Sequence, residues 1–498
     1  MQIKHDSETD QLANIAPWPI VASHSAKLQQ TDLQKISDLQ ASLTKEYPQL
    51  RSNWFAELGV QAGWQNAPCL YIEDHRSITR MSEEGAKRFE YRMLALSGPV
   101  DGYLVSAPRS LDFEAYMSQA LGAKSLRVWA TAAKTPMRRR LTDDARSSKT
   151  LMADLVRLAE RGRGLNLVPY IASGDVWTLA SALAKASDQP ISVLGPPPAL
   201  SALANDKLWF SQTVSRLIGS NSVPLSREIH SMTQLVCAVQ DLVPHSSRLV
   251  LKLPDSAGGL GNLNLSAEPF RGLRPRNVLT KIQRQLSEIG WRAGDKLLVG
   301  VWDTNVRISP SVQIWIPEPS GGDVIIEGLF TQQVEGEEGA FIGAERAELH
   351  PDLVDALIYQ AKQIATLFQS LGYVGRLSLD AVILSDRDTP ENIHWIEANA
   401  RWGGVSIPMT LANKLNRRQP SYQLVITQSL SNEKIHRSID AIEARLRAQK
   451  FEAGFSTSEI AIFLVPPRTG LILAVSLART AQRARDLAEM ALNACLSR

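Results

Sequence analysis

The chain has 498 residues, of which 44% are hydrophobic and 21% charged, a composition that fits a globular protein of two to four domains. Its net charge of +3 is small for this length and its apolar runs are too short to span a bilayer, so neither nucleic acid nor a membrane is expected as a partner. The three cysteines are far apart and have no metal-binding or disulfide spacing, which predicts a cytoplasmic protein without a disulfide framework.

Residues 1–195 are expected to form an α/β domain. After a polar segment with one amphipathic helix at 31–47, interpreted as an adapter, short apolar runs alternate with helical patterns. Strands separated by helices indicate a parallel sheet. The predicted strands are 69–72, 102–106, 126–130, 165–170 and 191–195, and the predicted helices are 111–121, 149–161 and 175–186. No GxGxxG motif follows any of these strands, and the prolines at 196–198 end the domain.

The next informative element is a strand at 249–253 that carries Lys252 in its interior. An unpaired buried ammonium group is costly, so Lys252 is expected to meet a phosphate or a carboxylate. A glycine-rich turn follows, and its residues Gly258, Gly259 and Gly261 allow backbone N–H groups to approach phosphate oxygens closely. An ordinary hairpin turn beside an edge lysine is the alternative, and the turn is not a P-loop because GxxxxGK[ST] is absent.

An apolar strand at 296–302 is followed at once by Asp303, and a second strand is predicted at 311–316. These two strands form either a wall against which a flat nucleotide base lies or a plain β-meander. An acidic, glycine-rich segment at 335–339 is either a lid or a solvated turn. A long amphipathic helix is expected at 351–371.

The stretch from 372 to 408 carries the strongest chemistry. Two apolar strands, 377–384 and 393–398, flank a polar turn, and a symmetric hairpin places Asp380 directly opposite Glu397. Glu397, Asn399 and Arg401 are spaced by two and therefore share one face if the strand continues. Facing carboxylates repel unless a cation lies between them, and oxygen-only ligands suit Mg²⁺. The alternative is a solvated hairpin edge with scattered charge.

The remainder of the chain is expected to form a helix at 409–416, a linker, and a small α+β domain. The tail pattern is helix, strand, strand, helix, at 432–450, 458–465, 471–477 and 479–496. No chemistry is assigned to this tail. The dispersed histidines form no HExxH motif, and no GxSxG motif indicates a serine hydrolase.

The paired motifs GRLSLD at 375–380 and EANAR at 397–401, in order after Lys207, Lys252 and the glycine turn, resemble those of the ATP-grasp superfamily of carboxylate-amine ligases, over about 199–425. The resemblance implies a fold of mixed α/β and α+β class in which two α+β subdomains clasp ATP. The expected domains are a pre-ATP-grasp domain at 1–195, an ATP-grasp domain at 196–428 and a small α+β domain at 429–498.

The resemblance also implies the roles of individual residues. ATP would contact the phosphate-binding lysines, the mobile glycine loop and the adenine hinge, which are Lys207, Lys252, Gly258, Gly259, Gly261, Val299, Val301 and Asp303. Asp380, Glu397 and Asn399 correspond to the ligands of two Mg²⁺ ions, and Arg401 and Lys252 to the catalytic residues. The hinge departs from the family pattern, because Gly300 stands where an acidic residue is common, with Asp303 as its substitute.

The overall layout resembles peptide ligases of the pheganomycin biosynthetic type. This implies a ligase that activates a carboxylate as an acyl phosphate and joins it to the amine of an amino acid or peptide, with release of ADP and phosphate, in peptide natural-product biosynthesis. The expected partners are small-molecule or peptide substrates and a second copy of the chain. An ATP-grasp kinase or carboxylase, or a non-catalytic nucleotide-binding protein, is the alternative. Arg307 and Arg376 are the basic candidates for contacting the substrate acid.

Overall fold

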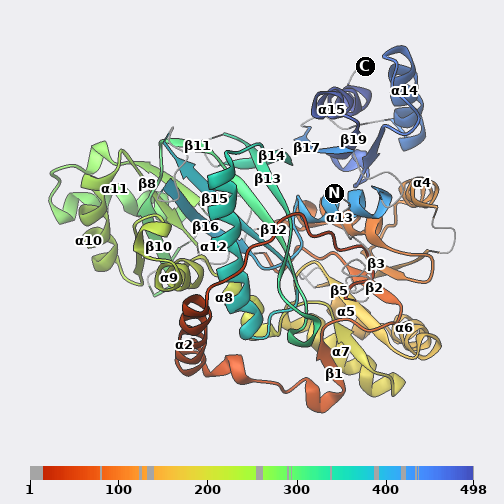
Figure 1. Cartoon of the computed structure of the whole chain (residues 1–498), viewed down its shortest axis with the longest axis horizontal. Helices are drawn as coiled ribbons and strands as arrows, with labels where there is room; N and C mark the ends of the chain where they lie inside the picture. Colours follow the sequence, from red (N-terminus) through yellow and green to blue (C-terminus); the bar gives the residue numbers. More distant parts are fainter. Residues whose placement is uncertain are drawn as a thin grey trace, which may run out of the picture.

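The computed structural model describes residues 15–78, 81–122, 126–131, 140–253, 262–288, 291–292, 294–336, 339–385, 392–416, 422–431, 435 and 437–496. Within these residues the chain forms three sheets. Figure 1 shows a parallel sheet, a central antiparallel sheet and, at the left of the view, a smaller sheet that contains β8 (Arg248–Lys252) and β10 (Leu297–Val301). No described helix combines the length and apolar character needed to cross a membrane.

The N-terminal region forms the expected parallel sheet, with strand order β1-β6-β5-β2-β3-β4. Helices cover it, and its central strands are buried along their whole length, as in parallel sheets covered on both faces. The strands are β1 (Val60–Ala62), β2 (Cys69–Ile72), β3 (Gly102–Ser106), β4 (Arg127–Thr131), β5 (Leu165–Pro169) and β6 (Ile191–Val193). The helices of this region are α3 (Glu83–Phe89), α4 (Leu111–Leu121), α5 (Leu141–Ser147), α6 (Lys149–Gly162) and α7 (Gly174–Ser187). The α/β prediction is confirmed.

The small sheet is antiparallel, with strand order β7-β10-β8-β9. Its strands are β7 (Ser226–Ile229), β8 (Arg248–Lys252), β9 (Asn262–Ser266) and β10 (Leu297–Val301), and helices α10 (Met232–Leu242) and α11 (Pro275–Glu288) belong to the same unit. The apolar side chains of this unit form a core of their own, built only from residues between 229 and 301 in the described part of the chain.

The large sheet is antiparallel and has the order β11-β15-β12-β13-β14-β17-β19-β18, with β16 beside β15. Its strands before the tail are β11 (Val306–Ile308), β12 (Pro310–Ile316), β13 (Ile325–Glu335), β14 (Ala340–Arg346), β15 (Gly375–Leu384) and β16 (Ile393–Asn399). Helix α12 (Pro351–Ser370) begins at a proline and buries Leu353, Leu357, Ile364 and Phe368 at helical spacing, as predicted. Helix α9 (Lys207–Leu217) contacts β16, and α2 (Gln30–Glu46) and α8 (Pro198–Ala204) lie nearby.

The predicted tail elements are present as α14 (Ile439–Glu452), β18 (Ile460–Phe463), β19 (Leu471–Ala478) and α15 (Ala481–Leu496). The predicted linker after α13 (Ser406–Asn416) is wrong in part, because a strand, β17 (Gln423–Leu430), follows there. β17 pairs with β14 on one side and with β19 along its full length on the other, so the tail strands extend the large sheet. The proposed boundary at 428 therefore falls inside β17, and the three-domain division stays a proposal.

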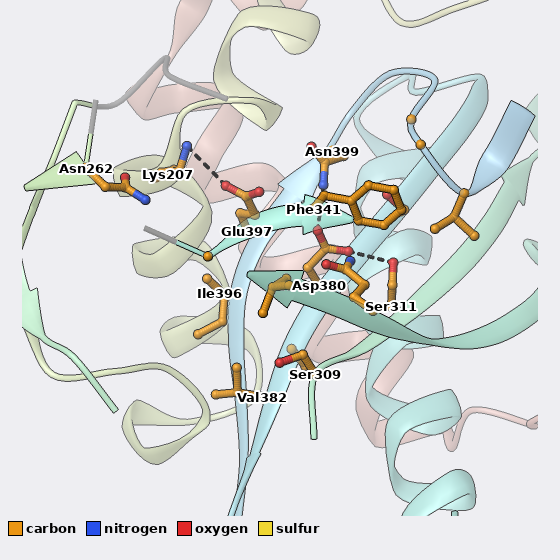
Figure 2. A pocket seen from close by; sticks show the side chains of 18 of the residues that line it. Lys207, Asn262, Ser309, Ser311, Phe341, Asp380, Val382, Ile396, Glu397 and Asn399 are labelled. Carbon is orange, nitrogen blue, oxygen red and sulfur yellow. Dashed lines mark hydrogen bonds and ion pairs between the residues drawn. The ribbon is translucent and has the colours of Figure 1, made fainter. Parts of the chain in front are cut away.

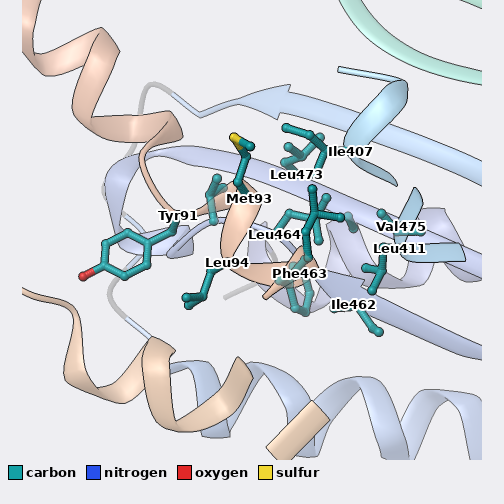
Figure 3. Packing of buried hydrophobic residues seen from close by; sticks show 14 of the residues in the cluster. Tyr91, Met93, Leu94, Ile407, Leu411, Ile462, Phe463, Leu464, Leu473 and Val475 are labelled. Atoms are coloured by element: carbon teal, nitrogen blue, oxygen red, sulfur yellow. The ribbon is translucent and has the colours of Figure 1, made fainter. Parts of the chain in front are cut away.

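One apolar core joins the N-terminal region to the tail. Figure 3 shows Tyr91, Met93 and Leu94 of the N-terminal region in the same cluster as Phe463 and Leu473 of the tail. The segment before α2 also enters this core: the ring of Trp18 lies 5.0 Å from that of Trp402, 6.1 Å from that of Trp315 and 6.3 Å from that of Tyr71. The parallel sheet, the large sheet and the tail thus share one interior.

Candidate active site

The β15–β16 hairpin pairs Asp380 with Glu397, so this predicted register is confirmed. A bulge follows the pair, between Asp380 and Ala381. On its other side β15 pairs with β12, and there Ser311 is the partner of Asp380. The predicted turn spans 385–392, and its residues 386–391 lie outside the described part of the chain.

Asp380 receives hydrogen bonds from neighbouring side chains, two of which are seen in Figure 2. The Ser311 hydroxyl donates to Oδ1 at 2.6 Å, and the Asn399 amide donates to Oδ2 at 2.8 Å. Burial raises the pKa of Asp380, as does the facing Glu397, to about 6, although hydrogen bonds from Ser311 and Gln332 act in the opposite direction. The pair therefore holds a carboxylate whose ionised form is disfavoured by its surroundings.

The negative charge of Glu397 is compensated by neighbouring cations. Burial alone would raise its pKa, but Lys207 and then Arg401 lower it below its usual range. The Lys207 ammonium lies 3.1 Å from Oε2 of Glu397 (Figure 2). Lys207 is held at the first turn of α9, where the Asp206 side chain accepts hydrogen bonds from the amides of Leu208 and Trp209.

Lys252 ends strand β8 and faces the hairpin from the small sheet. Burial lowers the pKa of Lys252, with a further contribution from Lys207, to about 8. Its ammonium lies 5.8 Å from the centre of the Trp302 ring. The predicted need of Lys252 for an anion fits this position, because both Glu397 and Asp303 favour its charged form.

Arg401 lies two residues beyond the end of β16, and its guanidinium donates to the Asn205 side chain. Asn205 also bonds the backbone of Ala400 in both directions, at 3.2 Å and 3.3 Å. Asn205 and Ser311 were not singled out from the sequence as site residues. The only signal for Asn205 is its position two residues before Lys207, and Ser311 is identified only by its register with Asp380.

A cavity of about 620 Å³ brings most of the predicted site residues together, and it is lined by Lys207, Lys252, Val301, Asp303, Asp380, Glu397, Asn399 and Arg401 among others. Val299 is not among its lining residues, because its side chain is buried in the core of the small sheet. Gly258, Gly259 and Gly261 lie outside the described residues. The Asp303 carboxylate lies 2.9 Å from Nδ1 of His394, within hydrogen-bonding distance.

The two arginines suggested for the substrate acid do not line this cavity in the described structure. Arg376 is buried beside Glu327, with its guanidinium carbon 5.3 Å and 5.2 Å from the ring centres of Trp315 and Trp402. That suggestion is therefore wrong for Arg376, whose side chain faces the core.

The donor set fits Mg²⁺. Among the described residues no group of three or more His, Cys, Asp or Glu side chains is arranged to hold a metal. Mg²⁺ does not need such a cage, since it is commonly bound by one or two carboxylates together with waters and substrate phosphates. Asp380 and Glu397 supply two oxygen ligands from paired positions, and a cation between them would relieve the repulsion that raises the pKa of Asp380.

Comparison with known proteins agrees with this architecture. Residues 90–184 match the family model described as the pre ATP-grasp domain. A solved N5-carboxyaminoimidazole ribonucleotide synthetase in complex with ADP has a TM-score of 0.52 and 13% identity, over 87% of this chain and 98% of that one. Biotin carboxylase from Campylobacter jejuni, in a complex with a β,γ-ATP ligand, has a TM-score of 0.50 and 14% identity, over 86% and 92%.

The biotin carboxylase domain of Hydrogenobacter thermophilus 2-oxoglutarate carboxylase, with MgADP, ADP and bicarbonate, has a TM-score of 0.50 and 12% identity, over 86% of this chain and 90% of that one. No curated protein matches the sequence closely enough to count as a relative. Identities this low establish the fold alone, and at that level the resemblance predicted from the sequence is confirmed.

Replacing Ser311 by alanine tests the support of Asp380. The S311A variant is expected to bind Mg²⁺ with nucleotide roughly tenfold more weakly, because a hydrogen bond to a charged carboxylate at 2.6 Å is lost. Titration of nucleotide affinity against Mg²⁺ concentration measures the effect. S309A is the matched control, since Ser309 lines the same cavity, whereas it is Ser311 that donates to Asp380. Equal Mg²⁺ dependence in both variants would contradict this role of Ser311.

Proposed function

We propose that this protein, which has the ATP-grasp fold, is an ATP- and Mg²⁺-dependent ligase that joins a carboxylate to the amine of an amino acid or peptide and releases ADP and phosphate. One observation carries the proposal. Asp380 and Glu397 are opposed across the hairpin, in one cavity with Lys207, Lys252 and Arg401. Two carboxylates and three cations converging on one cavity suit the binding of a polyphosphate with its metal ion.

In the proposed reaction a substrate carboxylate oxygen bonds to the γ-phosphorus of ATP, and the bond between that phosphorus and the β–γ bridging oxygen breaks. ADP leaves and an acyl phosphate remains. The amine nitrogen then bonds to the acyl carbon, the bond from that carbon to the phosphate oxygen breaks, and inorganic phosphate and one proton are released. The carboxylate is a poor acyl donor before this activation and a good one after it.

The side chains of the cavity have distinct roles in this proposal. Lys207 and Lys252 neutralise charge that builds on the transferring phosphoryl group. Arg401, fixed by Asn205, faces the oxyanion that forms when the amine attacks. Asp380, Glu397 and the oxygen of Asn399 would hold Mg²⁺, which supplies charge neutralisation of the phosphates when bound. No covalent nucleophile from the protein is required.

The finer parts of the proposal concern context. The layout resembling pheganomycin-type peptide ligases supports a role in peptide natural-product biosynthesis, in the cytoplasm, with a homodimer as the assembly and two Mg²⁺ ions bound. The solved structures with ADP, one of them with MgADP, support nucleotide and Mg²⁺ use by this fold. Val299 and the glycine turn stay part of the proposed nucleotide site on sequence resemblance.

The test is a product screen with purified protein, ATP and Mg²⁺, across amino acids and dipeptides, each with and without bicarbonate. We expect ADP and phosphate to be released in equal amounts with an amide, identified by mass. Release of AMP and pyrophosphate would contradict the ligase proposal. A bicarbonate requirement with a carboxylated product would favour a carboxylase, and a stable phosphorylated product a kinase. ATP binding without turnover of any substrate would favour a non-catalytic nucleotide-binding protein.

A further inference from the structure

The cavity extends beyond the proposed phosphate and metal site to an end built partly by the N-terminal region. We call this the ring-lined end, and its wall consists of His75, Met81, Phe89, Tyr170, Phe341 and Val405. Figure 2 shows Phe341 next to Asn399 and Asp380, so the ring-lined end adjoins the proposed metal site. None of these six residues has a role in the proposed phosphate transfer.

The topology of the parallel sheet independently marks this place. The strand order runs from β2 to β3 and β4 on one side and from β5 to β6 on the other, so the order reverses between β2 and β5. In open α/β sheets, ligands bind outside the carboxyl ends of the strands at such a switch point. His75 follows the end of β2 by three residues and Tyr170 follows β5 directly, and both line the cavity.

The rings form a stacked, fixed wall. The His75 ring centre lies 3.9 Å from that of Tyr170 and 5.0 Å from that of Phe89, and both pairs are stacked. Arg92, which also lines the cavity, places its guanidinium carbon 4.8 Å from the Phe89 ring centre and 5.3 Å from that of Tyr170. A cation already placed against these rings uses the electron-rich faces that would otherwise attract a cationic ligand.

The polar groups behind the wall are satisfied by one another. Arg92 Nε donates to Glu73 at 2.7 Å, Arg92 Nη2 lies 3.2 Å from Nε2 of His75, and Glu73 also accepts from the Met93 amide at 2.8 Å. Glu73 is completely buried. Burial lowers the pKa of His75, which keeps the ring neutral. As far as the described residues go, the ring-lined end therefore offers a neutral, largely apolar surface, with no carboxylate for a cationic side chain and no uncompensated cation for an anionic one.

We propose that the ring-lined end is a specificity subsite that receives the neutral apolar or aromatic side chain of an amino-acid substrate, while its reacting group lies at Arg401 and the paired carboxylates. This inference rests on the proposed function. Gly403 and Gly404 line the cavity between the two ends, and a Cβ added at Gly404 would come within 3.0 Å of the Phe341 ring. The absence of side chains there leaves a path for the substrate backbone.

Calorimetric titration of the full chain, with ADP and Mg²⁺ present, tests the subsite with L-phenylalanine, L-leucine, L-lysine and L-glutamate as probes. We expect L-phenylalanine and L-leucine to bind at least about tenfold more tightly than the two charged amino acids. F89A, from the N-terminal region, and F341A, from the large sheet, should each weaken L-phenylalanine binding on the order of tenfold, with ADP affinity retained in F89A. F451A is the matched control, because Phe451 is 86% exposed, and it should change nothing.

Equal affinities for the four probes, no binding of any of them, or unchanged L-phenylalanine affinity in the variants would overturn the subsite. If F89A does not fold, F341A decides. Failure of the proposed function is a separate result, since the probe preference is read from binding and the ligase reaction from ADP release. A chain that prefers apolar amino acids but forms no amide retains the subsite and loses the ligase assignment.

Discussion

The D380N variant is expected to lose ATP-dependent turnover by on the order of 10² to 10³ while remaining at least as stable as the natural chain. The substitution removes the charge but keeps the shape of the side chain, its neighbours Ser311 and Asn399, and the Lys207–Glu397 ion pair. A residue that destabilises its own fold and is needed for turnover is typical of a functional site. ADP release and thermal unfolding in Mg²⁺-free buffer measure the two effects.

The stability gain expected for D380N depends on pH. The pKa of Asp380 in the folded chain is about 6, above the ordinary value of 3.8. The folded state therefore binds more protons than the unfolded state between these values, and this carboxyl destabilises the fold increasingly as pH rises from about 4 to above 6. The stability gain of D380N should therefore be small near pH 4 and full above about pH 6. D323N is the control, since Asp323 is an exposed carboxylate paired with Lys362 outside the cavity. A D380N variant that turned over ATP normally would contradict the metal-site assignment.

The K252M variant is expected to bind ATP roughly 10- to 100-fold more weakly at pH 7, because a charge-assisted contact to phosphate is lost. The natural chain should show its own pH dependence. The pKa of Lys252 is about 8 in the folded chain, so above pH 8 nucleotide must supply the energy to protonate it, and ATP affinity should fall by up to about tenfold per pH unit. K252M should lack this decline. Equilibrium titrations with ATP and Mg²⁺ from pH 7 to 9.5 measure both effects.

Lys252 also makes the stability of the folded chain depend on pH. The pKa of Lys252 in the folded chain lies below the ordinary value of 10.5, so between about pH 8 and 10.5 the unfolded chain binds more protons and the contribution of Lys252 to the free energy of unfolding rises with pH. K296M is the matched control, because Lys296 directly precedes β10 in the same small sheet but is half exposed, 3.9 Å from Glu228. A pH dependence of ATP affinity that persisted unchanged in K252M would remove Lys252 from the nucleotide site.

The local elements of the fold could be predicted from the sequence where hydrophobic periodicity was strong. The parallel sheet, α12, and the pairing of Asp380 with Glu397 follow from alternation, helical spacing and hairpin symmetry, and the structure confirms them. Strand β17 was missed because the sequence before it, 417–422, is polar and reads as a linker. Its partners, β14 and β19, are distant in the sequence, and such pairing leaves no local pattern.

The candidate site shows the same division. Lys207, Lys252, Asp380, Glu397 and Arg401 carry a readable chemistry, and the fold brings them to one cavity. Residues whose contribution depends on packing had no such signal. Arg376 belongs to the same GRLSLD motif as Asp380, yet its side chain is buried against Glu327, Trp315 and Trp402, which lie elsewhere in the sequence and leave no local signal. His75, Phe89 and Tyr170 reach the cavity only through the crossover topology of the parallel sheet.

The separate apolar interior of the small sheet has a mechanical consequence. The described residues between 229 and 301 bury their apolar side chains against one another, whereas the interior around Trp18 and Phe463 joins the parallel sheet, the large sheet and the tail. The described residues of this unit contribute no side chain to the interior around Trp18 and Phe463, so a small displacement of the unit would leave that interior intact.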